Sequence, residues 1–176
     1  LVVVLALARQ VGVLFQRIAP MGALVTTGGV AAGTEAPRLR LTAQSGRPIE
    51  IGGPDARASL LFFVSPSCPV CKTLLPVVKH IAAEESRTLR VIWASDGDES
   101  RQVDFVRDSG LPADDYVVSR DLGLAYRVDR LPHAVIVGRD GRVVARGLVN
   151  NREQVESLIR ALELGVPSVQ AYLQEG

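Results

Sequence analysis

The sequence is poor in cysteine, histidine and aromatic residues, and each shortage narrows what the chain can do. Two cysteines in 176 residues exclude a framework of several structural disulfides. Aromatic residues make up 5% of the chain against 47% for all hydrophobic residues, so aliphatic side chains must fill the core. The formal net charge is +1, and no basic stripe interleaved with aromatic residues is present. This balance argues against a nucleic-acid partner.

The two cysteines that are present, Cys68 and Cys71, stand only two residues apart. A structural disulfide stabilises most by closing a long loop, and this pair would close almost none. A zinc site would need further ligands from His80, His133 or carboxylates, and neither histidine has the spacing of a ligand pair. A redox-active pair, half of a zinc site and an inert buried pair are the alternatives, and the spacing favours the redox pair.

Composition divides the chain into three parts. The apolar run 1–8 is shorter than the roughly 20 residues that span a bilayer, and we interpret it as the end of a membrane anchor. A buried or disordered terminal strand is the alternative. Apolar residues within 11–18 then fall on one helical face, and residues 22–36 are typical of a linker. The predicted parts are an anchor end, amphipathic helix and linker (1–35), a folded domain (36–165) and a C-terminal tail (166–176).

Within the folded domain, apolar runs alternate with amphipathic segments. The continuous apolar runs 59–64 and 89–94 are typical of central strands buried on both faces. Asp140-Gly141 predicts a hairpin late in the chain, and Ser45-Gly46 predicts another before the first buried strand. The pattern predicts an α/β domain with strands at 38–42, 48–51, 59–64, 89–94, 116–119, 134–137 and 142–146, and helices at 69–85, 103–108 and 121–126, with a final helix from a cap at Asn150 or Asn151 through 164.

The segment Cys68-Pro69-Val70-Cys71 follows a buried strand and opens a helix. The first amides of a helix have no intrahelical partners and its dipole is positive there, so a thiolate at Cys68 is stabilised. Cysteines in such settings have pKa values of about 3.5 to 7.5, against about 8.5 when free. Cys68 can then attack a partner disulfide, and Cys71, one turn inside, can resolve the mixed disulfide. Pro69 suits the first helical turn, where its missing N–H costs nothing.

The run Cys68–Lys72 resembles the active site of thioredoxin-like proteins. The similarity extends to Pro76, where that family kinks its active-site helix, and to Leu131-Pro132-His133, where it keeps a cis-proline facing the two sulfurs. It covers residues 36–164 and includes the late hairpin and last helix. The resemblance implies a thioredoxin-like fold, with a central mixed β-sheet flanked by helices and an added N-terminal β-hairpin. It also implies a redox-active disulfide that needs no cofactor and no metal.

The same resemblance assigns roles around Pro132. With a cis bond there, the Leu131 backbone is free to pair with an extended substrate segment, and Leu131 and His133 would tune its affinity. An ordinary trans proline before a strand is the alternative for Pro132. For His133 the alternative is a solvated loop residue, and His80 is interpreted as a residue of the helix surface.

Two positions depart from thioredoxin itself. Thioredoxin carries a buried aspartate six residues before its first active-site cysteine, and this sequence has Phe62 there. Ser67 stands where thioredoxin has tryptophan. These differences argue against a general disulfide reductase.

Residues 8–14, 17–24, 68–71 and 163–166 carry a closer similarity, to the MauD family of methylamine dehydrogenase accessory proteins. That family is membrane-anchored, carries a thioredoxin-like domain on the periplasmic side of the inner membrane, and is linked to maturation of the enzyme's small subunit. That subunit contains several disulfides and a tryptophan-derived quinone. The resemblance implies that this chain forms or isomerises those disulfides.

Two other functions are kept as alternatives. One is a reductase of the cytochrome c maturation type, which shares the anchor and the fold. The other is a non-catalytic assembly scaffold, in which the cysteine pair is secondary. The acidic residues Asp96, Asp98 and Glu99 could suggest a metal site, but they also fit the start of a helix, and we interpret them as capping.

Overall fold

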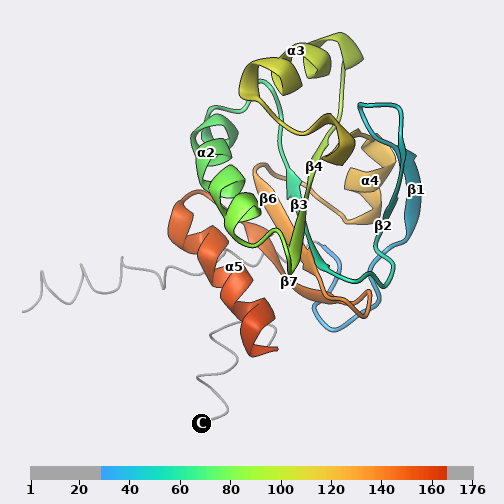
Figure 1. The fold of residues 1–176 in the computed structure, drawn as a ribbon, viewed down its shortest axis with the longest axis vertical. Helices are drawn as coiled ribbons and strands as arrows, with labels where there is room; N and C mark the ends of the chain where they lie inside the picture. The colour runs from blue at the N-terminus through green and yellow to red at the C-terminus, as the bar shows by residue number, and fades with distance from the viewer. Residues whose placement is uncertain (1–28, 166–176) are drawn as a thin grey trace, which may run out of the picture.

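Residues 29–165 are described by a computed structural model, which Figure 1 shows coloured along the chain. The predicted membrane anchor, the helix over 11–18 and the tail 166–176 lie outside these residues. Within the described part, no helix is both long and apolar enough to cross a membrane.

A mixed five-stranded sheet forms the centre of the molecule, in the order β5-β4-β3-β6-β7. Strand β3 lies in the middle, parallel to β4 and antiparallel to β6. Its residues are almost all apolar and buried, because helices or the hairpin cover both faces of the sheet there. The strands are β3 (Ala58–Phe63), β4 (Leu89–Ser95), β5 (Tyr116–Val118), β6 (His133–Val137) and β7 (Val143–Leu148).

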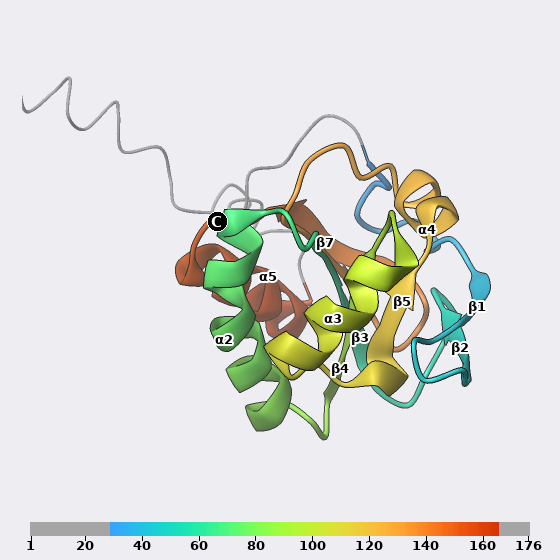
Figure 2. The same cartoon turned by 90° about the horizontal axis from the view of Figure 1, so that it is seen from above.

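The two faces of the sheet carry different layers (Figures 1 and 2). Helices α2 (Pro69–Glu84), α3 (Glu99–Ser109) and α5 (Arg152–Leu164) cover one face with a core that includes Cys71. The short helix α4 (Arg120–Ala125) and the β1–β2 hairpin cover the other face. The α/β fold and the thioredoxin-like arrangement predicted from the sequence are therefore confirmed.

The N-terminal hairpin consists of β1 (Leu39–Thr42) and β2 (Pro48–Ile51), as predicted. The predicted linker 22–36 is wrong at its C-terminal end, because residues 33–36 belong to the folded unit. Gly33 N–H donates to the Val143 carbonyl at 2.7 Å, and Val143 N–H donates to the Thr34 carbonyl at 2.9 Å. Strand β7 is an edge strand, and this segment satisfies backbone groups that would otherwise be unpaired.

Helix boundaries show what the apolar periodicity missed. Helix α3 begins at Glu99 rather than Val103, since its first turn is polar and the Asp98 side chain caps it by accepting from Ser100 N–H. The last helix was predicted correctly from a cap: it starts after Asn151, one of the two predicted caps, whose side chain accepts from Gln154 N–H at 2.9 Å. A short 3-10 helix over Ala113–Asp115 was not predicted.

Candidate active site at the start of helix α2

Cys68 and Cys71 form a disulfide at the N-terminal end of α2, with their Cα atoms 5.3 Å apart. Cys68 is the residue that caps the helix, and Pro69 and Val70 are the first two residues inside it. The strand β3 ends five residues before Cys68, so the buried central strand of the sheet delivers the motif to the carboxyl end of that strand.

The two sulfurs occupy different environments. Cys71 is 0% exposed and belongs to the core beneath α2, whereas Cys68 is only partly buried. The Cys68 Sγ accepts a hydrogen bond from the Cys71 backbone N–H at 3.1 Å. No acidic residue lies in the first turn of α2. An N–H donor and the positive end of the helix dipole both favour negative charge on the Cys68 sulfur, so this is the sulfur that can react with a partner.

The residues around the pair match their predicted positions. Pro69 fills the first turn, and its carbonyl accepts from the Thr73 hydroxyl at 3.2 Å. Val70 is 40% exposed beside the disulfide, where its side chain can contact a partner. Pro76 lies inside α2, where it has no N–H to donate to the Lys72 carbonyl.

The position of Phe62 is filled by core packing rather than by an acid. Its side chain is 0% exposed and meets the Trp93 ring edge-on, with centroids 5.6 Å apart. Phe62 therefore contributes apolar volume beneath α2 and cannot take a proton from Cys71.

The peptide bond between Leu131 and Pro132 is cis, which confirms the prediction. Pro132 is buried, and its carbonyl accepts from Val149 N–H at 3.0 Å, which ties the turn to the end of β7. Within residues 29–165, the Leu131 backbone groups have no backbone partner. An N–H and a carbonyl are thus left for an incoming chain.

His133 is not a solvated loop residue, so that alternative is wrong. It is the first residue of β6, paired with Phe63 on one side and Leu148 on the other, and its side chain is 0% exposed. Neither ring nitrogen has a hydrogen-bond partner. Burial is the main cause that lowers the pKa of His133 to about 4; the charge of Arg146 acts in the same direction, and that of Asp129 opposes it. The imidazole is therefore neutral at pH 7 and packs edge-on against Phe63.

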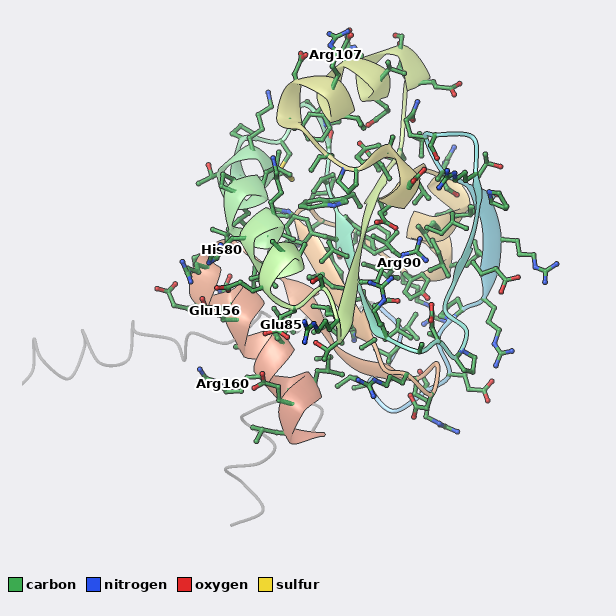
Figure 3. All side chains as sticks on the ribbon, in the orientation of Figure 1. His80, Glu85, Arg90, Arg107, Glu156 and Arg160 are labelled. Atoms are coloured by element: carbon green, nitrogen blue, oxygen red, sulfur yellow. A yellow bond between two sulfur atoms is a disulfide. The ribbon has the colours of Figure 1, made fainter. Side chains whose placement is uncertain are left out.

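The remaining candidates are surface features. His80 lies on the outside of α2 (Figure 3). Its Nε2 is 3.3 Å from the Glu84 carboxylate. Asp98 caps α3, as predicted for one of the three acidic residues. Across residues 29–165, no group of three or more His, Cys, Asp or Glu side chains could hold a metal ion.

Sequence reasoning missed a cavity of about 180 Å³ beside the cis-proline turn. Its walls come from the ends of β3 and β4, from α4 and from the turn before β6. Because these segments are far apart in the chain, no contiguous motif marks them. Two residues of its lining were singled out in the sequence, Leu131 as the residue before Pro132 and Asp96 as part of an acidic group, but no sequence pattern connects them.

A family model described as Redoxin matches residues 31–162 of the chain. The methylamine utilization protein MauD of Paracoccus versutus is 41% identical over 172 residues, covering 98% of this chain and 86% of the relative. The protein of the same name from Methylorubrum extorquens is 40% identical over 174 residues, covering 98% and 84%.

Two solved structures share the fold at low identity. A DsbE-type thiol:disulfide interchange protein from Chlorobium tepidum has a TM-score of 0.68 and 16% identity, covering 77% of this chain and 98% of that one. The thioredoxin domain of a thiol–disulfide oxidoreductase from Bacteroides vulgatus has a TM-score of 0.64 and 16% identity, covering 76% and 99%. With the Cys68–Cys71 pair at the helix start, the chain belongs to the MauD family of redoxin-type thiol–disulfide oxidoreductases.

Proposed function

We propose that this protein forms or isomerises disulfides in the small subunit of methylamine dehydrogenase. The observation that carries the proposal is the difference in exposure between the two cysteines at the N-terminal end of α2: Cys68 is partly exposed and Cys71 is fully buried. Such an arrangement lets the exposed sulfur react with a protein partner while the other sulfur stays buried. The relatives are methylamine utilization proteins, which supports this choice of substrate.

In the oxidising direction, a substrate thiolate attacks the Cys68 sulfur of the disulfide. The Cys68–Cys71 bond breaks, a mixed disulfide forms on Cys68, and Cys71 leaves as a thiolate that takes up a proton. A second substrate thiolate then attacks the substrate sulfur of the mixed disulfide and releases Cys68. Two electrons have moved from the substrate to the pair, and a disulfide of another redox protein returns the pair to its oxidised form.

In the isomerising direction, the reduced protein starts the reaction and no net electrons are transferred. The Cys68 thiolate attacks a substrate disulfide, and the released substrate thiolate attacks another disulfide of the same subunit. Cys68 leaves when a substrate thiol attacks the mixed disulfide. No cofactor beyond the Cys68–Cys71 pair is required in either direction.

The substrate segment would lie across the cis-proline turn. The unpaired backbone groups of Leu131 support strand-like pairing with an extended chain, and Pro132 would present that chain to Cys68. The buried, neutral ring of His133 would not contact the substrate and would instead support the turn by filling the space beside it in the core. Val70, which stands between the two cysteines in the chain, offers an exposed apolar contact to a partner.

The proposed location is the periplasmic side of the inner membrane, with the N-terminal segment as a tether. The uninterrupted apolar run over 1–8 supports an anchor, and net disulfide formation requires an oxidising compartment.

Trapping tests the proposal. Cys71→Ser leaves the Cys68 thiolate able to attack a disulfide of the small subunit, but removes the Cys71 thiol that could otherwise displace a bound chain, so a mixed disulfide between Cys68 and the small subunit should accumulate in cells that assemble methylamine dehydrogenase. Cys68→Ser is the matched control and should trap no partner. Recovery of cytochrome c maturation proteins instead would favour the reductase, and maturation that survives loss of both cysteines would favour the scaffold.

The reduction potential separates the directions independently. Oxidants of this fold have potentials near −120 mV and reductants near −270 mV. A measured value at the reducing end would contradict the oxidase.

A further inference from the structure

The cavity beside the cis-proline turn is lined by apolar residues, by the hydroxyl-bearing Ser95 and Ser119, and by exposed charged residues at its mouth. The buried side chains of Phe63, Val64 and Ala94 line its inner part. Its other walls include Val128 and Leu131, which are partly buried. The cavity thus lies at the carboxyl ends of β3 and β4, the end of the sheet that also carries the disulfide.

Three exposed charged residues line the mouth: Asp96, Asp129 and Arg130. In the described range 29–165, none of the three takes part in an ion pair. Two carboxylates against one guanidinium leave the mouth with an excess negative charge. An incoming cationic group would therefore find carboxylates that are not already neutralised by a salt bridge.

We propose that this cavity binds a lysine or arginine side chain of the substrate polypeptide, close to the cysteine that reacts with Cys68. The inference rests on the proposed function, and it adds a sequence preference to it. A chain that pairs with the Leu131 backbone directs alternate side chains to opposite sides. Because the Leu131 side chain itself lines the cavity, one of the neighbouring substrate side chains faces the opening.

Both halves of a lysine or arginine side chain match the cavity. The methylene stem can pack against Val64, Val128 and Leu131, while the charged head stays near the water-exposed carboxylates. A glutamate side chain would bring a third negative charge to Asp96 and Asp129. A leucine side chain would fill the interior of the cavity but would form no ion pair with Asp96 or Asp129.

The test compares three peptides that carry one cysteine as an activated mixed disulfide with a chromophoric thiol. The residue beside the cysteine is lysine, leucine or glutamate. The Cys68 thiolate of the reduced protein attacks the peptide sulfur and the chromophoric thiol leaves, so with the protein in excess the release of the chromophore gives the second-order rate constant of this single turnover. Each partly exposed ion pair contributes about two- to fivefold, so we expect lysine to exceed glutamate roughly tenfold at low salt and less at high salt.

Variants at the mouth identify the source of the preference. Asp129→Asn and Asp96→Asn should each reduce the ratio of the rate constant for the lysine peptide to that for the glutamate peptide. In the double variant the two rate constants should be equal. Arg130→Gln should raise the ratio. Asp121→Asn is the matched control, because Asp121 is an exposed carboxylate in the first turn of α4 that does not line the cavity. Assays at pH 7.5 keep His133 neutral throughout.

The ratio of the rate constants for two peptides does not depend on the reactivity of Cys68, since the same sulfur attacks both peptides. Equal rates for lysine and glutamate peptides, or a preference that survives the double variant, would overturn the binding of a cationic side chain. If the protein exchanges with none of these peptides and also fails with a small neutral disulfide, the proposed function itself fails.

Discussion

The buried imidazole of His133 gives a prediction whose size follows from the structure. His133 is 0% exposed, and burial lowers its pKa to about 4, against about 6.5 in an unfolded chain. Above pH 6.5 both states are neutral and the residue adds no pH dependence. Below pH 6.5 the unfolded chain binds the proton first, so the free energy of unfolding falls as the pH drops towards 4. At pH 4.5 the loss is about 2.5 kcal/mol.

Replacing His133 by Phe removes this proton and keeps a planar ring next to Phe63. The variant also removes two buried nitrogens that lack partners, each of which costs about 1 to 3 kcal/mol. Urea unfolding of the oxidised protein at pH 7.0 and pH 4.5 measures the effect. We expect the drop in free energy between the two pH values to be smaller by about 2.5 kcal/mol in His133→Phe than in the natural protein.

His80→Gln provides the control, because His80 is the other histidine of the chain and is exposed on α2. In this variant the drop in the free energy of unfolding between pH 7.0 and pH 4.5 should stay close to that of the natural protein. An identical drop in His133→Phe and the natural protein would refute the reasoning, whatever offset the ring exchange itself produces. It would mean that His133 is already charged, or bonded to water, in the folded state.

Substitutions at three further positions test core packing, a helix cap and a backbone conformation of the fold. Phe62→Ala empties fully buried volume beneath α2 and should lower the free energy of unfolding by about 3 to 5 kcal/mol in urea titrations; a loss below 1 kcal/mol would contradict the packing. Asn151→Ala removes the cap of α5 and should cost about 1 kcal/mol, seen as a lower Tm, whereas Asn151→Ser should retain most of it. Gly52→Ala should cost about 1 to 3 kcal/mol, because φ is +86° and the new methyl group would collide with the Pro37 carbonyl; a Tm equal to that of the natural protein would argue against this backbone conformation.

The parts of the site that lie together in the chain could be predicted from the sequence. Cys68 and Cys71 share one helical turn, and a buried apolar run before them identifies the strand that delivers them. The cis bond at Pro132 followed from a family pattern, not from local chemistry, because most bonds before proline are trans.

The parts that depend on long-range pairing could not be predicted. The burial of His133 results from Phe63 and Leu148 on its two sides, and these residues are 70 positions before and 15 positions after it in the sequence. The cavity beside Leu131 has walls from several separate segments, so its charged residues resemble ordinary surface residues when they are taken one by one. Residues 33–36 look like linker in composition, and only the free edge of β7 makes them part of the fold.

The central claim is that Cys68 is the accessible nucleophile and Cys71 the protected one. The most direct measurement is alkylation of the fully reduced protein with iodoacetamide at pH 7.0, followed by mass spectrometry of each cysteine, with the urea-unfolded protein as reference. We expect Cys68 to react about tenfold faster in the folded protein than in the unfolded one, and Cys71 to remain unmodified until unfolding. Equal rates at the two cysteines, or a folded Cys68 no faster than an unfolded one, would contradict the account.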